Sequence, residues 1–396
     1  MKTATESVAG PRISAEQVAG FRLSRHHLAT PATKASIARV AGDMCGAQAQ
    51  VISAAALALR ARIRGLRQED VEKALWQDRV LAKTWCMRGT IHLIPSKEYS
   101  VFVRGTARRE KRAEGWLTRH GLTAPIVDQL MEATGKALDR PLTRHELAKR
   151  IAASVGKHRK VHRSRGWGNR GPTDVVEIGG ATLSVDAIVW LASARSLACW
   201  GPEAGDGPTH VRPDAWLPGM RETAPEEAET ELVRHYLRAF GPATLREFAI
   251  WTAIGVRAAQ EVWGRIGSEI VPVQVDGKTG SVLRRDLPAL RRAKLTGPTV
   301  RLLPYFDGFL LGNTERDHLV DARHYKEVYR PAGWIAAVVL VDGRVQGTWS
   351  YDRKGDRILV RVEPFRPLAR AVREGVEAEA ADVARFFDSR LELTIH

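Results

Sequence analysis

The sequence has few cysteines and lacks the short signatures of several large enzyme classes. Its three cysteines, Cys45, Cys86 and Cys199, are scattered, without a Cys-x-x-Cys pair or a zinc-finger spacing, which predicts buried thiols in a reducing compartment and no structural zinc. A phosphate-binding Walker loop, the Gly-x-Ser-x-Gly and His-Glu-x-x-His motifs and a dinucleotide-binding glycine fingerprint are also missing. Nucleotide hydrolysis, α/β-hydrolase chemistry and zinc proteolysis therefore have no support in the sequence.

Long hydrophobic runs are absent as well. The longest apolar stretch, residues 334–341, is far short of the ~20 residues that a membrane-spanning helix needs. Residues 1–10 lack the basic and then apolar layout of a signal peptide. We therefore expect a cytoplasmic protein without membrane association.

Acidic residues are too few to balance the basic ones. The 396 residues include 61 Lys and Arg against 45 Asp and Glu, which gives a formal net charge of +16. Such a field favours polyanions, with nucleic acid as the first expectation. A hydrophobic content of 44% indicates a folded protein, and the length predicts two to four domains of about 100–200 residues.

Two glutamines, Gln48 and Gln50, stand between two helix-like runs. Glycines, among them Gly46, interrupt the first run, and residues 52–64 read as a second helix rich in Ala, Leu and Arg. Residues i and i+2 point about 200° apart on an α-helix but to the same side of an extended chain. A shared site therefore requires an extended backbone, or one just entering the helix, at residues 46–51. Spacing alone favours the alternative of two surface amides at a helix start.

The elements after the glutamines follow the order of a winged helix-turn-helix. Residues 71–81 are predicted to form a further helix, and residues 81–95 two short strands with a turn near Gly89. Helices followed by a β-hairpin give the order of that motif. Residues 97–120 then read as a basic helical stretch.

A second copy of this order follows. Thr143 and Glu146 form a capping box at the start of a helix. A second helix is predicted over residues 185–196, and residues 197–200 and 209–212 can form the wing around a Gly/Pro turn.

The third copy has the clearest signals. Residues 226–240, 244–251 and 256–266 read as helices, and Thr244 and Glu247 form another capping box. Strands over residues 270–275 and 281–285 meet at the Asp276-Gly277 turn. The three copies share an order of elements rather than a residue-level repeat.

The last hundred residues change character. Residues 300–303, 334–341, 344–349, 357–362 and 391–396 read as strands, with one helix over residues 367–388. Closure would remove exposed edges, so we predict a small β-barrel. The fold class is thus α+β, with three tandem winged helix-turn-helix units followed by that barrel. The predicted domain boundaries are 12–125, 126–222, 223–296 and 297–396.

Residues 156–171 form the most basic segment, with six Lys or Arg and no acid. Its glycines and its lack of apolar periodicity predict a loop. Such a loop could hold backbone phosphates, with Trp167 stacked on or inserted beside a base, or it could simply be solvated. The predicted DNA-binding residues are Arg88, Arg108, Arg109, Lys157, Arg159, Lys160, Arg163, Arg165, Trp167 and Arg170.

Two further polar residues have structural interpretations. Asp307 lies near Glu315, Arg316 and Asp317, and such a cluster is most often a turn with a structural salt bridge. His92 lies between apolar residues on a predicted strand, where a histidine is usually a hydrogen-bonded structural residue.

Four motifs occur in one order along the chain: residues 46–51 (GAQAQV), 85–93 (WCMRGTIHL), 302–312 (LLPYFDGFLLG) and 343–349 (GRVQGTW). Together they resemble the AlkZ-type DNA glycosylases of the winged-helix superfamily that also includes YcaQ. The resemblance implies three tandem winged helices and a C-terminal β-barrel around a concave DNA-binding cleft. It also implies monofunctional excision of N-alkylated purines, including unhooking of interstrand cross-links. The family's Gln-apolar-Gln motif falls on Gln48-Ala49-Gln50, which makes both glutamines the expected catalytic residues. The YcaQ branch has an acid at the second position, so Gln50 places this chain with the AlkZ branch.

The chemistry agrees with a pair of neutral amides. A purine alkylated at N7 or N3 is already cationic and leaves without protonation, whereas glycosidic cleavage usually needs an acid. A glutamine oxygen can orient water and face the developing positive charge on the sugar. The helix starting near Ile52 would place a positive dipole end close to that cation, or it could favour a hydroxide-like nucleophile.

Two other classes remain open at this stage. A non-catalytic winged-helix protein, such as a transcription regulator, would use the same basic surface but would prefer a DNA sequence. An RNA-binding module lacks its usual aromatic stacking signatures. We expect a monomer that acts on double-stranded DNA with alkylated purines and uses no metal or organic cofactor.

Overall fold

The computed structural model describes residues 10–108, 121–162, 172–205 and 207–396. The contacts within the chain define two compact units. Unit 1 comprises Met1–Glu72, Thr230–Trp251 and Ala259–His396, and unit 2 comprises Lys73–Glu229 and Thr252–Ala258.

Unit 1 begins with helices that carry the glutamine segment. They are α1 (Ala15–Arg25), α2 (Ile37–Asp43) and α3 (Ile52–Arg60), with the short extended segment β2 (Ala47–Gln48) between the last two. Ser14 caps α1 in a capping box with Gln17, which satisfies backbone N–H groups that the first turn leaves without intrahelical partners. Helix α3 ends at Arg60, before the predicted residue 64.

The middle of the chain confirms the third predicted set of elements. Its helices are α11 (Pro225–Phe240), α12 (Leu245–Thr252) and α13 (Val256–Arg265). Thr244 and Glu247 exchange the hydrogen bonds of the predicted capping box. Strands β11 (Ile270–Val275) and β12 (Lys278–Leu283) pair antiparallel. Asp276 and Gly277 both have positive φ at their turn, as a type I′ hairpin requires. Strand β1 (Arg12–Ile13) adds in parallel to β11.

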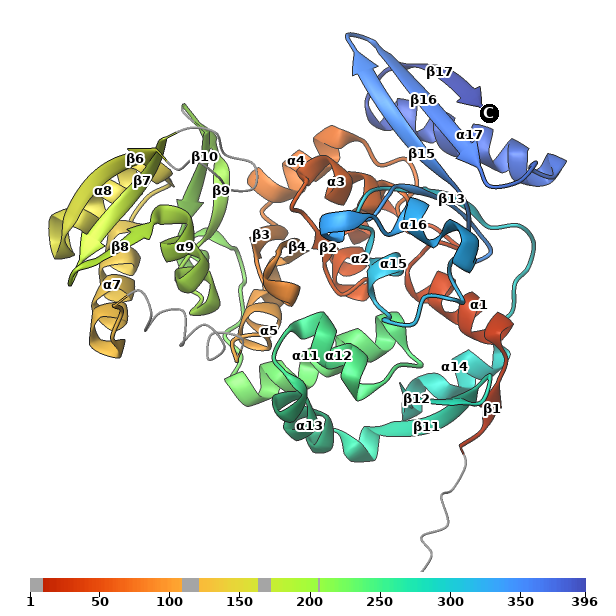
Figure 1. Ribbon diagram of the computed structural model, residues 1–396, viewed down its shortest axis with the longest axis horizontal. Helices are drawn as coiled ribbons and strands as arrows, with labels where there is room; N and C mark the ends of the chain where they lie inside the picture. The colour runs from red at the N-terminus through yellow and green to blue at the C-terminus, as the bar shows by residue number, and fades with distance from the viewer. Residues whose placement is uncertain (1–9, 109–120, 163–171, 206) are drawn as a thin grey trace, which may run out of the picture. The chain divides into compact units, whose positions relative to one another are not determined.

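The C-terminal sheet is open, so the predicted β-barrel is wrong. Its order is β13 (Val300–Leu303), β14 (Val338–Val341), β15 (Arg344–Lys354), β16 (Arg357–Pro364) and β17 (Arg390–Ile395). Within the described residues, β13 and β17 are the two edges and do not pair. Helix α17 (Arg370–Phe386) packs against both edge strands (Figure 1). Because this helix buries Val376, Ala380 and Val383, the sheet obtains its cover without closing on itself.

Unit 2 contains the predicted hairpin and the second set of helices. Strands β3 (Leu81–Trp85) and β4 (Ile91–Pro95) pair antiparallel across a turn at Met87–Gly89. The helices are α5 (Tyr99–Arg104), α7 (Ala124–Ala137), α8 (Arg144–Val155) and α9 (Val185–Ala194). Strands β9 (Cys199–Ala204) and β10 (Gly207–Val211) pair antiparallel. The Thr143–Glu146 capping box is confirmed at α8. Helix α4 (Gln68–Trp76) ends earlier than predicted, since β3 begins at Leu81.

The described part of the basic segment contains a strand where a loop was predicted. Lys157–His162 forms β6, which pairs antiparallel with β7 (Pro172–Ile178), and β7 pairs with β8 (Ala181–Ser184). Strand β6 is an edge of this sheet, and edge strands carry charged side chains well. The sequence showed no apolar alternation because this strand exposes most of its side chains.

No helix within the described residues is both long and apolar enough to cross a membrane.

Candidate active site

A tight helix ending leads the chain into the glutamine segment. The N–H of Gly46 donates to the carbonyl of Ala41 at 2.8 Å, and the N–H of Cys45 donates to the carbonyl of Gly42 at 2.9 Å. These two bonds form a Schellman motif at the end of α2. Cys45 has a φ of 57°, a left-handed conformation that costs a non-glycine residue about 1–2 kcal/mol. The chain therefore leaves α2 in a fixed direction.

The two glutamines lie on one side of the segment that follows. Ala47 and Ala49 are buried, with 0% and 2% exposure, whereas Gln48 is half-buried and Gln50 is exposed. This alternation is that of an extended chain. An extended backbone is the condition that a site shared by both glutamines requires.

Helix α3 begins directly after Gln50. Val51 is its N-cap, with extended φ and ψ and without a side-chain cap. The carbonyl of Val51 accepts from the N–H groups of Ala54 and Ala55. The positive end of the α3 dipole therefore lies within two residues of the glutamines, as the sequence predicted.

A buried ion pair fixes the other end of α3. Both side chains of Arg62 and Asp307 are fully buried. Arg62 Nη2 donates to Asp307 Oδ1 at 2.7 Å and Arg62 Nη1 donates to Oδ2 at 2.8 Å. Asp307 also accepts from the N–H of Phe309 at 2.9 Å and so caps α15 (Gly308–Leu311). The structural interpretation of Asp307 is confirmed, although its partner is Arg62, while Glu315 pairs with Lys278.

The same contact brings α15 beneath the turn before the glutamines. A methyl group at Gly308 would lie 3.8 Å from the carbonyl oxygen of Met44 and 4.0 Å from that of Gly46. Asp307 therefore holds both the end of α3 and the backbone that supports the glutamine segment.

Arg60, the last residue of α3, makes a second buried connection. Its side chain is fully buried and donates to Glu379 at 3.0 Å, to Asp382 at 3.1 Å and to the carbonyl of Leu302 at 2.7 Å. These partners lie on α17 and β13. Sequence reasoning missed both arginines, because the run LALRARIR gives no sign of partners roughly 250 to 320 positions away.

Burial keeps His26 neutral beside Arg62. His26 is fully buried between Phe240 and Phe309. Its burial, and then the positive charge of Arg62, lower its pKa well below the ordinary value. A neutral imidazole can accept from Arg62 without like-charge repulsion.

His92 is a structural histidine on the hairpin of unit 2. It is fully buried, its Nδ1 lies 3.1 Å from the carbonyl of Thr90, and its Nε2 lies 3.3 Å from Arg88 Nη2. Because a carbonyl only accepts and a guanidinium only donates, the proton is on Nδ1. Arg88 is therefore half-buried against His92, at a backbone φ of 54°.

Apart from Arg88, the predicted DNA-binding residues fall into three groups. Lys157, Arg159 and Lys160 are exposed on β6, and Arg159 also contacts Glu177 at 2.9 Å. Arg108 forms a two-point ion pair with the buried Glu229, which offsets its charge. The others, Arg109, Arg163, Arg165, Trp167 and Arg170, lie outside the described residues.

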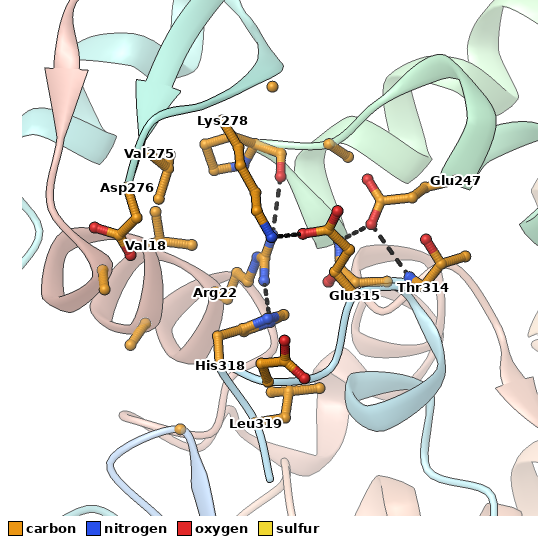
Figure 2. Close-up of a pocket in the computed structure, with 18 of the residues that line it drawn as sticks. Val18, Arg22, Glu247, Val275, Asp276, Lys278, Thr314, Glu315, His318 and Leu319 are labelled. Atoms are coloured by element: carbon orange, nitrogen blue, oxygen red, sulfur yellow. Dashed lines mark hydrogen bonds and ion pairs between the residues drawn. The ribbon is translucent and has the colours of Figure 1, made fainter. Parts of the chain in front are cut away.

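A cavity of about 1020 Å³ in unit 1 was not predicted. Figure 2 shows Arg22 and His318 facing each other inside it, with Arg22 Nη1 2.9 Å from His318 Nε2. Arg22 also donates to the carbonyl of Pro242 at 2.9 Å. Burial lowers the pKa of Arg22 to about 10 and that of His318 to about 3. Glu247 accepts from Asn313 and Thr314 at the cavity wall. These contacts tie α1 and α12 to the loop before β14.

Comparisons with known proteins point to one family. The family model described as "DNA glycosylase AlkZ-like" matches residues 41–386. The chain is 34% identical over 384 residues to an "Interstrand DNA cross-link repair glycosylase" of Streptomyces sahachiroi, covering 94% of this chain and 96% of that protein. The solved structure of the DNA glycosylase AlkZ of Streptomyces sahachiroi superposes with a TM-score of 0.79 at 31% identity, covering 97% of this chain and 100% of that one. The matched residues include the glutamine segment, α3 and the Asp307 turn, and the chain therefore belongs to the AlkZ-like DNA glycosylase family.

Proposed function

We propose that this protein is a monofunctional DNA repair glycosylase that hydrolyses the N-glycosidic bond of N-alkylated, cationic purines, and that it also unhooks interstrand cross-links. Gln48 and Gln50 are the proposed catalytic residues. The observation that carries this proposal is that Gln48 and Gln50 are accessible while Ala47 and Ala49 are buried, the alternation of an extended segment.

The amides suit a leaving group that is already charged. An alkylated purine cation departs without an acid, so the enzyme needs to orient a water molecule and to face the sugar cation as it forms. Glutamine oxygens can do both without changing protonation state. The start of α3 would disfavour the sugar cation but would favour a water molecule that is losing its proton. We therefore assign Gln48 and Gln50 to orienting the water as well as to facing the cation.

The basic residues form the proposed binding surface for double-stranded DNA. Lys157 and Lys160 on β6 are exposed, so their charges suit phosphate contacts. Arg88, Arg108, Arg109, Arg159, Arg163, Arg165, Trp167 and Arg170 complete the proposed interface. The repeated order of helices and hairpins supports three tandem winged-helix domains over 12–125, 126–222 and 223–296, followed by the C-terminal region 297–396. We further propose that the protein acts as a monomer in the cytoplasm.

The test is single-turnover excision of 7-methylguanine from duplex DNA. We expect Gln48→Ala and Gln50→Ala each to slow excision by about 100-fold, the scale on which one preorganised polar group contributes. The double variant should lose little more, because the two amides act as one unit. DNA affinity should stay at the parental value, since neither side chain is a proposed phosphate contact.

Gln77→Ala is the matched control, since Gln77 is an exposed glutamine on a turn. Parental excision rates in both Gln48→Ala and Gln50→Ala would refute the catalytic assignment. No excision by the parent protein on any alkylated duplex, with retained sequence-selective binding, would refute the enzyme itself.

A further inference from the structure

Two histidines and one aspartate meet in unit 2, at the basic strand β6. His145 Nδ1 lies 2.9 Å from Asp174 Oδ1, and His158 Nε2 lies 2.7 Å from the same oxygen. The two imidazole centres are 5.2 Å apart. The three side chains are 34%, 19% and 14% exposed for His145, His158 and Asp174. The cluster is thus half-buried but open to solvent.

Three different elements bring these residues together. His145 belongs to the first turn of α8, His158 to the edge strand β6 and Asp174 to β7. Asp174 lies opposite Lys160 in the β6–β7 register, which makes it the diagonal neighbour of His158 on one face of the sheet. Helix α8 packs on β6 and β7 and delivers His145 to that face. The spacing along the chain, 145, 158 and 174, matches no metal-binding signature, so the sequence does not reveal the cluster.

The ligand set is that of a metal site. One ligand atom from each residue lies within 4.8 Å of the others, and among the described residues this is the one such group of His, Cys, Asp or Glu. Two imidazole nitrogens and one carboxylate oxygen suit Zn²⁺, with a water molecule in the fourth position. Metal–ligand bonds of about 2.0–2.1 Å in a tetrahedral site place neighbouring ligand atoms about 3.3 Å apart. The two nitrogen–oxygen distances to Asp174, 2.7 and 2.9 Å, need to lengthen by only about half an ångström to admit the ion.

We propose that His145, His158 and Asp174 bind one Zn²⁺ ion. The ion would link α8 to the edge strand β6 and would replace a local charge of −1 on the carboxylate by a net charge of +1. Lys157, Arg159 and Lys160 are on the same strand, so the bound ion would strengthen the positive field of this surface. Glycosidic hydrolysis by Gln48 and Gln50 does not require it, and the site is independent of the proposed function.

The experiment uses the full chain without an affinity tag, freed of metal with a chelator and then dialysed. Zn²⁺ is added during calorimetry and during thermal unfolding, and Co²⁺ replaces it for visible spectroscopy. We expect saturation at one equivalent, a higher midpoint of thermal unfolding, and the visible absorption band of tetrahedral Co²⁺. His145→Ala, His158→Ala and Asp174→Asn should each weaken Zn²⁺ binding by more than about 100-fold, since even an outer-shell partner contributes about 10–100-fold.

His324→Gln is the control, because His324 lies beside one carboxylate, Glu327, outside the cluster. It should bind Zn²⁺ like the parent. Zn²⁺ binding that does not saturate at one equivalent would overturn the proposal, and so would Zn²⁺ binding that survives in the cluster variants. The three residues would then form only a hydrogen-bonded His–Asp–His network. If a variant fails to fold, the parent protein still tests the proposal, because absence of the tetrahedral Co²⁺ band from its spectrum would refute the site.

Discussion

The buried pair Arg62–Asp307 gives the sharpest prediction about stability. Asp307→Ala leaves the Arg62 guanidinium buried without its carboxylate, and breaking a fully buried pair from one side costs about 3–5 kcal/mol. It also removes the acceptor for the N–H of Phe309, worth about 1 kcal/mol as a helix cap. We therefore expect unit 1 to lose about 4–6 kcal/mol, a large part of the roughly 5–15 kcal/mol that stabilises a typical protein.

Urea unfolding followed by tryptophan fluorescence measures this loss. Trp349 is one of the eleven tryptophans that contribute to this signal, and its indole N–H donates to the carbonyl of Leu303 in the C-terminal sheet. The control is Asp317→Ala, which removes an exposed carboxylate ten positions away and should leave the unfolding midpoint unchanged.

A second variant distinguishes the cost of an unpaired buried charge from the cost of lost side-chain packing. Replacing both partners with apolar residues, in Arg62→Met combined with Asp307→Leu, removes the unpaired charge and should recover much of the stability lost in Asp307→Ala. A loss below about 1 kcal/mol in Asp307→Ala would refute the reasoning, since no buried charge would then depend on this carboxylate. Asp307→Ala should also slow base excision, because the pair holds the end of α3 behind the glutamines.

Three further changes test other parts of the chain. His210 is fully buried, and burial lowers its pKa to about 3. Because the unfolded imidazole takes up a proton near pH 6.5 and the folded one does not, the contribution of His210 should lower stability as pH drops below that value, by about 2 kcal/mol at pH 5. His210→Phe should flatten this fall in acid-unfolding curves, and an unchanged slope would contradict it. Gly312→Ala places a methyl group 1.9 Å from a ring carbon of the buried Phe240, so chemical denaturation should show a loss of about 1–3 kcal/mol, whereas parental stability would mean that the ring can move aside. Lys157→Ala combined with Lys160→Ala should reduce the salt dependence of DNA binding by a slope of about 0.9 per lost phosphate contact, and an unchanged slope in a titration from low to high salt would exclude both lysines from the interface.

The sequence determined most elements by itself, where the signals were local. Capping boxes at Thr143 and Thr244 and the Asp276-Gly277 turn depend on neighbours within a few positions, and each one forms as predicted. For the glutamine segment the sequence set only a condition: a site shared by Gln48 and Gln50 requires an extended backbone, whereas their spacing alone favoured two surface amides.

Only the tertiary structure decided how distant segments pair. An amphipathic strand pattern cannot tell an open sheet from a closed one, and α17 covering the sheet made closure unnecessary. Strand β6 forms because β7 supplies its hydrogen bonds, although its own basic sequence resembles a loop. Arg62 pairs with Asp307, which is 245 positions away in the sequence. His145 contacts Asp174, beside His158, because helix α8 packs against the sheet that carries both residues. Side-chain chemistry fixes what such residues can do, but their partners are set by packing, which local sequence does not encode.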